Sequence, residues 1–313
     1  MNFSDYTLVS FGDSFTFGQG LTDPHPMFDT KEANNSKAYS NIIKNQLGFK
    51  DIINLGFPGA SNDGILSMMQ TFYHKNRDPN HFYLISLTSP ERDEIFTIRE
   101  STKLYNTFDF SYQSWKSGNR EWKSKNKELN RLSGYDFEIY SKLSDNTVKE
   151  FLTYYHNNYS ILLKHVHTFY GMINFLLNNN IKFCIVDVLN DAPSLNGRYD
   201  ILKQIEKDGW RKYFIDNGYV DVELLEMYYE DLEKKNIKQY LNFYELIDLP
   251  EFVGTGKPNN KKCFSNIHSY VLKYGKEHLG DAKNVLLPCD HWNNSGHEIA
   301  AALISDFIRK THD

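Results

Sequence analysis

A serine follows directly on a short apolar run near the start of the chain, in the segment Leu8-Val9-Ser10-Phe11-Gly12-Asp13-Ser14. The apolar run predicts a buried strand, and the glycine and aspartate predict a turn at its end. In an open parallel sheet the ligand crevice lies outside the carboxyl ends of the strands, so Ser14 stands where a hydroxyl can meet a substrate. Such a turn also leaves backbone N–H groups for an oxyanion. The chemistry indicated is nucleophilic attack by Ser14.

Two histidines stand close together near the other end of the chain. A hydroxyl is a weak nucleophile until a base within hydrogen-bond reach takes its proton. The two histidines belong to the segment His291-Trp292-Asn293-Asn294-Ser295-Gly296-His297, just before a helical pattern over Ile299 to Ile308. We interpret His297 as a helix-start or packing residue, and Asp13 as a brace for the serine turn.

These segments, with a third one, resemble the SGNH (GDSL-type) hydrolases. The family opens on a Gly-Asp-Ser block, matched by Gly12-Asp13-Ser14, and has a strand-end segment of the form Asn-x-Gly-x-x-Gly, matched by Asn54-Leu55-Gly56-Phe57-Pro58-Gly59. Its catalytic histidine lies near the C-terminus in the context that surrounds His291. The resemblance implies Ser14 as nucleophile, His291 as general base, and an oxyanion hole formed by the backbone N–H groups of Ser14 and Gly59. It implies no metal and no organic cofactor.

The chain departs from the family pattern in the third block. The family has Gly-x-Asn-Asp, whose asparagine donates to the oxyanion, whereas this sequence reads Thr88-Ser89-Pro90-Glu91. Asn62, Ser89 and Arg92 are the candidate substitutes. Arg92 has two further interpretations: it binds a carboxylate or phosphate of the substrate, or it forms a salt bridge with a neighbouring acid.

The second departure concerns the acid that orients the histidine. The family has an aspartate two or three residues before it, where this sequence has Pro288 and Cys289. Asp290, immediately adjacent to His291, is the candidate acid after a local rearrangement. A backbone carbonyl in that role, or a serine–histidine dyad, are the alternatives.

The elements that must position these residues follow an alternating pattern. Ser36 is predicted to cap a helix that ends at Gly48, and a strand follows over 51–55. Next we expect a helix capped by Ser61 or Asn62, and then a strand over 81–87. A capping box at 147–150 opens a long helix that runs to Leu177, and a strand covers 183–189. Alternating strands and helices indicate a parallel sheet. With the resemblance, this predicts a three-layer α/β/α, flavodoxin-like fold over 1–313, with insertions at 97–146 and, mainly helical, at 190–281.

Composition sets the outer limits of the interpretation. The chain has 313 residues, 40% hydrophobic and 24% charged, with a net charge of -5 and three scattered cysteines. These values fit a packed globular protein and argue against a nucleic-acid partner. We find no signal peptide and no apolar run of membrane-spanning length, and expect a soluble protein made in the cytoplasm without membrane contact. The oligomeric state is left open.

The function predicted is cleavage of a carboxylic ester through an acyl-Ser14 intermediate. The substrate class expected first is a small O-acyl group, such as acetyl on a carbohydrate, a choice based on the breadth of the family and on aromatic residues in the insertions, among them Trp115 and Trp122. Two alternatives stand beside it. One is acyl transfer to another hydroxyl, and the other is a non-catalytic binding or structural protein on the same scaffold.

Overall fold

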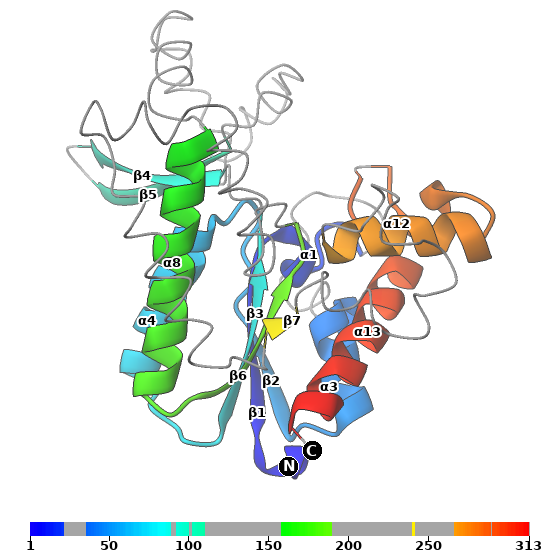
Figure 1. Ribbon diagram of the computed structural model, residues 1–313, viewed down its shortest axis with the longest axis horizontal. Helices are drawn as coiled ribbons and strands as arrows, with labels where there is room; N and C mark the ends of the chain where they lie inside the picture. The colour runs from blue at the N-terminus through cyan, green and yellow to red at the C-terminus, as the bar shows by residue number, and fades with distance from the viewer. Residues whose placement is uncertain are drawn as a thin grey trace, which may run out of the picture.

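A parallel β-sheet forms the centre of the molecule (Figure 1). The computed structural model describes residues 1–21, 36–88, 92–99, 102–109, 158–189, 240–241, 266–288 and 290–312. Within them the sheet has the order β2 (Asp51–Asn54), β1 (Thr7–Phe11), β3 (His81–Leu87), β6 (Lys182–Asp187) and β7 (Tyr240–Leu241). Every neighbouring pair is parallel. This is the flavodoxin-like order, in which the chain moves outward first on one side of β1 and then on the other. The predicted α/β fold with a parallel sheet is confirmed.

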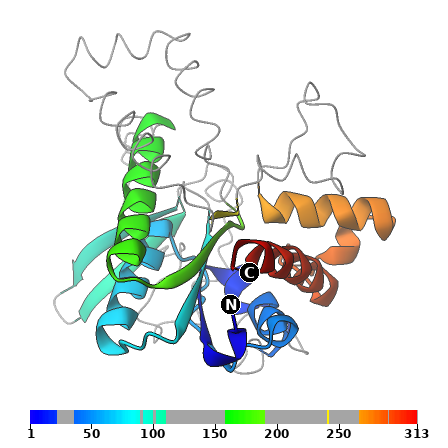
Figure 2. The ribbon, with the colours of Figure 1, turned by 60° about the horizontal axis from the view of Figure 1, so that its bottom comes forward.

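Helices cover both faces of this sheet (Figure 2). One face carries α3 (Tyr39–Leu47) and α13 (Asn294–His312), with α12 (Ile267–His278) against α13. The other carries α4 (Asn62–Lys75) and α8 (Asn158–Asn178), which pack on each other. Because strands buried on both faces need apolar side chains throughout, the inner strands β3 and β6 are mostly apolar, whereas β2, at the edge of the sheet, begins and ends on polar residues.

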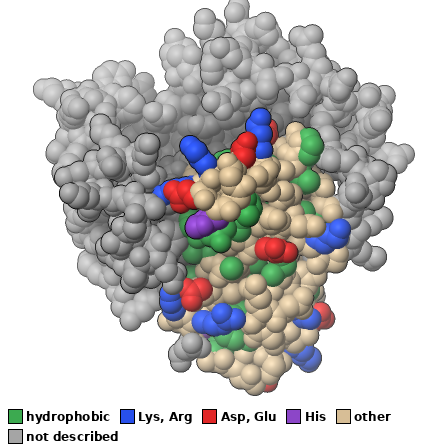
Figure 3. Space-filling model, turned by 90° about the vertical axis from the view of Figure 1, so that its right-hand side faces the viewer, with side chains coloured by type: hydrophobic (Ala, Val, Ile, Leu, Met, Phe, Trp, Pro, Cys, Tyr) green, Lys and Arg blue, Asp and Glu red, His purple; other side chains and the backbone are tan. Residues whose placement is uncertain are grey.

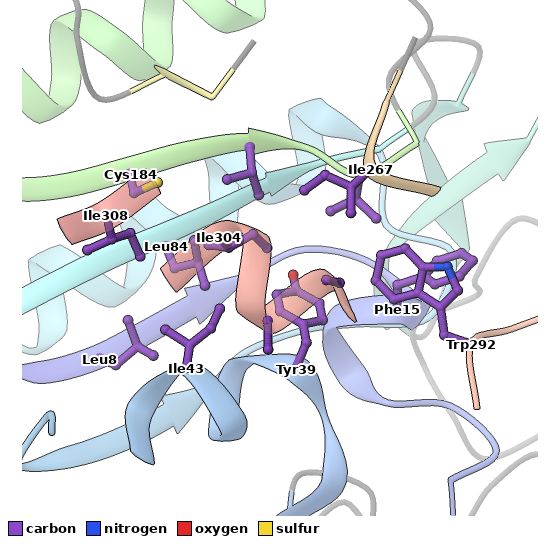
Figure 4. Close-up of a cluster of buried hydrophobic side chains, with 14 of the residues drawn as sticks. Leu8, Phe15, Tyr39, Ile43, Leu84, Cys184, Ile267, Trp292, Ile304 and Ile308 are labelled. Carbon is purple, nitrogen blue, oxygen red and sulfur yellow. The ribbon is translucent and has the colours of Figure 1, made fainter. Parts of the chain in front are cut away.

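Two apolar clusters follow from this layering, one on each face of the sheet. Leu8, Leu84 and Cys184 point toward α3 and α13 (Figure 4), whereas Val9 and Phe11 point toward α4 and α8. Successive residues of a strand face opposite ways, so β1 supplies both clusters in alternation. The sheet is thereby packed on both faces. At its carboxyl end, β1 is followed by α1 (Ser14–Phe17).

The ends of the predicted helices are mostly found in the structure. Ser61 is the N-cap of α4, its hydroxyl accepting from the Gly64 N–H at 3.1 Å, and Gly48 ends α3 with φ +75°. The prediction for Ser36 is wrong, because the N-cap of α3 is Ala38, whose side chain has no acceptor. Helix α13 begins at Asn294, earlier than predicted.

The remaining elements lie at the margins of the sheet. A separate antiparallel hairpin, β4 (Arg92–Arg99) and β5 (Thr102–Asp109), starts before position 97. Short 3₁₀ turns cover Phe3–Asp5 and Ala282–Val285. Between 190 and 281, β7 extends the main sheet and α12 contributes buried apolar residues. The helical patterns at 201–213 and 222–232, the capping box at 147–150, Trp115 and Trp122 lie outside the described residues.

The surface over α12 and α13 carries basic and acidic side chains interspersed among apolar and polar ones (Figure 3). Neither sign gathers into a patch on the described part of this face. Among the described helices, none has the length and apolarity needed to cross a membrane.

Candidate active site

Ser14 lies at the switch point of the sheet, where the order in which the chain adds strands reverses. It is the first residue of α1, directly after β1, and β1 is hydrogen-bonded to β3 on one side and β2 on the other. Asp13 caps α1: one carboxylate oxygen accepts from the Phe15 N–H at 3.0 Å and the other accepts from the Thr88 hydroxyl at 2.8 Å. Since Thr88 follows β3, the buried Asp13 joins the two strand ends that flank the switch point. Its predicted role as a brace is confirmed.

The loop after β2 is fastened to the same turn. The Asn54 side chain donates to the Thr16 carbonyl at 2.7 Å and accepts from the Gly56 N–H at 2.8 Å, while the Phe57 N–H donates to the Gly12 carbonyl at 2.9 Å. A Cβ on Gly56 would lie 2.7 Å from the Thr16 carbonyl carbon, so only glycine permits this approach. The Asn-x-Gly part of the motif therefore brings the loop that carries Gly59 against the serine turn.

Two backbone donors at this junction have no acceptor among the described residues. Within the described residues, no hydrogen bond uses the N–H of Ser14 or of Gly59. Gly59 has φ +77°, a conformation that favours glycine. Ser14 is the first residue of α1, where a helix leaves its N–H groups without an intrahelical partner, and Gly59 is half-buried, so both donors are available to an external acceptor.

The three candidate substitutes for the family's oxyanion-binding asparagine are Asn62, Ser89 and Arg92, and they lie in different parts of the chain. Asn62, 6% exposed, donates to the Thr88 carbonyl at 3.0 Å and accepts from the Thr88 N–H at 2.9 Å. It therefore joins α4 to the end of β3. Ser89 lies outside the described residues; Arg92 is the first residue of β4, and its side chain is outside them too.

His291 is carried by a small loop with a fixed backbone. Leu286 and Trp292 pair in an antiparallel bridge, the Leu287 N–H donates to the His291 carbonyl at 2.7 Å, and Asp290 takes φ +61° as the loop turns. The ring of His291, half-buried, lies 5.2 Å from the ring of Phe15, centroid to centroid. The two ends of the sequence that carry the motifs thus meet beside Ser14.

Two contacts of a catalytic triad are absent between the described residues. The Ser14 hydroxyl makes no hydrogen bond to any described residue, although Ser14 is only 5% exposed. Asp290 is exposed, and in the described part of the chain its side chain makes neither a hydrogen bond nor an ion pair. Catalytic hydrogen bonds often tighten only in the substrate complex, so the gap at Ser14 does not argue against its pairing with His291.

Asn293 and Gly296 have structural explanations. The Asn293 side chain accepts from the Gly296 N–H at 3.1 Å, opening α13, and donates to the Asn284 carbonyl at 2.8 Å. A Cβ on Gly296 would lie 2.6 Å from the Val285 carbonyl oxygen. Both residues hold the His291 loop against the start of α13.

His297 stabilises a helix other than its own. Its Nδ1 accepts the Tyr39 N–H at 3.1 Å, supplying the cap that Ala38 cannot give to α3. The two rings stack 5.9 Å apart. Burial, reinforced by nearby His291, lowers the pKa of His297 to about 3. The predicted helix-start or packing role is confirmed, although the helix concerned is α3.

A chain of buried hydroxyls lies beneath the serine turn. The Tyr39 hydroxyl shares hydrogen bonds with Thr16, at 2.7 Å, and with Ser86. Burial raises the pKa of Tyr39, so the phenol stays protonated. A Cβ on Gly12 would lie 2.0 Å from Thr16 Oγ1, which explains the glycine of the Gly-Asp-Ser block.

His268 is a residue at this site that the sequence interpretation missed. It lies at the start of α12, where its ring contacts Phe15 at 5.4 Å and stacks on Trp292 at 6.2 Å. Phe15 and Trp292 lie against each other at the end of the apolar cluster (Figure 4), with centroids 4.6 Å apart. A single histidine opening a helix carries no sequence signal of such a contact.

Comparison with known proteins gives a likeness to solved structures. No family model and no curated protein matches the chain. Among solved structures, a similar one is described as a carbohydrate esterase whose active site has divergent catalytic and non-catalytic binding functions. It is 13% identical, with a TM-score of 0.38 over 98% of this chain and 69% of that one. The assignment of the site therefore depends on the residues and geometry given above.

Proposed function

We propose that the protein hydrolyses carboxylic esters through an acyl-Ser14 intermediate, with His291 as the general base. The observation that carries the proposal is the contact between the rings of Phe15 and His291 at 5.2 Å, because Phe15 is the immediate neighbour of Ser14. A hydroxyl at the switch point of the sheet, an imidazole beside it and two unpaired backbone donors support acyl transfer chemistry.

The proposed reaction has two halves. His291 takes the Ser14 proton as the hydroxyl oxygen attacks the ester carbonyl carbon, and returns it to the leaving alcohol as the ester C–O bond breaks. Water then attacks the acyl-serine with the same base, which releases the acid and restores Ser14. In both halves the N–H groups of Ser14 and Gly59 would bind the oxyanion, each worth about 3–4 kcal/mol in the transition state.

The exposed Asp290 favours a serine–histidine dyad within this proposal. The backbone bonds of the loop from Leu286 to Trp292 hold His291 in place without use of the Asp290 side chain. An aspartate orients an imidazole and stabilises its protonated form, so a dyad is expected to be slower than a triad but to use the same intermediate.

The test is hydrolysis of p-nitrophenyl acetate, followed by a panel of O-acetylated sugars as the proposed substrate class. Ser14→Ala and His291→Asn should each lower kcat/KM by at least about 10³-fold. Ser4→Ala, at an exposed serine of the first 3₁₀ turn, is the matched control and should match the wild type. Unchanged hydrolysis in Ser14→Ala would contradict the proposal.

A binding protein on the same scaffold is the second candidate. The observations that favour it are that, within the described part of the chain, the Ser14 hydroxyl makes no hydrogen bond and the Asp290 side chain makes no contact with His291. A binding function predicts that the folded wild-type protein hydrolyses no ester of the panel but binds one of the O-acetylated sugars. Turnover abolished by Ser14→Ala would exclude it.

A further inference from the structure

We infer that His268 is a positioning residue for His291. It accepts the indole N–H of Trp292, the residue next to His291, and thereby fixes the loop on which the proposed base is carried. The inference rests on the proposed function for the role of His291, and the contacts that carry it come from three separate elements.

Trp292 is the connection between the two histidines. Its side chain is wholly buried, and a buried indole N–H that lacks an acceptor destabilises the folded protein. The acceptor is His268 Nδ1, at 3.1 Å from Nε1, with the two rings stacked at an interplanar angle of 19°. Because Trp292 also pairs with Leu286 across the base of the His291 loop, fixing the indole fixes that loop.

His268 is itself anchored to the sheet. Its backbone N–H donates to the Val188 carbonyl at 3.1 Å, and the Val188 N–H donates to the Leu87 carbonyl at 3.0 Å. The buried Asn266 caps α12 by accepting from the Ser269 N–H at 2.8 Å. The position of His268 is thus set by the ends of β6 and β3, the second of which is also tied to Asp13 through Thr88.

Phe15 connects this group of rings to Ser14, the residue before it in the sequence. Its ring contacts His268 at 5.4 Å, Trp292 at 4.6 Å and His291 at 5.2 Å. A displaced indole would therefore move the residue next to Ser14 together with the loop of the base. Misplacement of reacting groups by about 1 Å can cost about 10²-fold in rate.

The chemistry of the contact provides matched variants. A neutral imidazole that accepts at Nδ1 carries its proton on Nε2, and an asparagine at the same position offers its Oδ1 as a substitute acceptor. His268→Asn should therefore keep the bond that His268→Ala loses. Trp292→Phe removes the donor from the other side and keeps an aromatic ring in the core.

Kinetics with p-nitrophenyl acetate provide the first readout. His268→Ala and Trp292→Phe should each lower kcat by about 10–100-fold with KM within about twofold of the wild type, and the double variant should be no worse than either. His268→Asn should recover most of the loss. Equal impairment of His268→Asn and His268→Ala, or an unchanged kcat in both His268→Ala and Trp292→Phe, would overturn the inference.

A second readout separates the inference from the proposed function. If the wild type hydrolyses no ester, the proposed function fails, but the imidazole ¹H–¹⁵N resonances of His291 still report its surroundings. They should shift in His268→Ala and in Trp292→Phe and return toward the wild type in His268→Asn. Wild-type His291 resonances in both loss variants, with folding verified by thermal unfolding, would overturn the positioning role.

Discussion

Acidification should weaken the protein through His297, and the size of the effect follows from the structure. The buried ring accepts the Tyr39 N–H, which only the neutral imidazole can do, and its pKa is lowered to about 3. An unfolded histidine has a pKa of about 6.5. Between that pKa and the lowered pKa of the folded state, His297 therefore binds a proton in the unfolded state but not in the folded state. The stability from the neutral ring is complete above about pH 6.5 and is lost as the pH falls. The slope is about 1.4 kcal/mol per pH unit, or about 2.7 kcal/mol by pH 4.5.

The assay is urea unfolding at pH 7.5 and pH 4.5, with His297→Asn beside the wild type. Burial also lowers the pKa of His81 and of His312, so part of the wild-type loss comes from those residues. Both remain in the variant and cancel in the comparison. The variant, which has no ring to titrate, should lose about 2.7 kcal/mol less than the wild type over this interval. Equal losses in the two proteins would refute the reasoning.

Two further substitutions test the contacts that hold the site. Gly296→Ala would place a Cβ 2.6 Å from the Val285 carbonyl oxygen. We expect thermal unfolding to show that the free energy of unfolding falls by at least about 2 kcal/mol. A change of less than about 0.5 kcal/mol would contradict that packing. Asn62→Ala removes both hydrogen bonds to the Thr88 backbone and should cost about 1–3 kcal/mol in urea unfolding, whereas a variant as stable as the wild type would show that the link is dispensable.

Much of the fold could be predicted because its signals are local. The apolar runs of β1 and β3 are short, continuous and ended by turn residues, and Ser61 and Gly48 are ordinary helix caps. The elements that were missed depend on distant partners. The β7 strand, Tyr240–Leu241, is too short to produce a pattern and exists only because β6 offers an edge. The hairpin that begins at Arg92 lies where the sequence reads as the end of a strand.

The candidate site was predictable to the extent that motifs mark it. Ser14, Gly59 and His291 come from such motifs, and the structure explains Gly12, Gly56 and Gly296 as places where a Cβ has no room. Two histidines show where sequence reasoning ends. His297 caps a helix more than 250 residues away in the sequence, and His268 accepts a hydrogen bond from a tryptophan on another segment. Such partners are set by tertiary packing, which no spacing in the chain encodes.

The most direct measurement of the central claim is the site of covalent reaction with a fluorophosphonate, a probe that forms a stable bond with activated serine hydroxyls. Peptide mass spectrometry of the treated wild type should place a single adduct on Ser14, and folded His291→Asn should acquire it at least about 10²-fold more slowly. A folded wild-type protein that takes up no probe at Ser14, or a His291→Asn variant that reacts at the wild-type rate, would contradict the account.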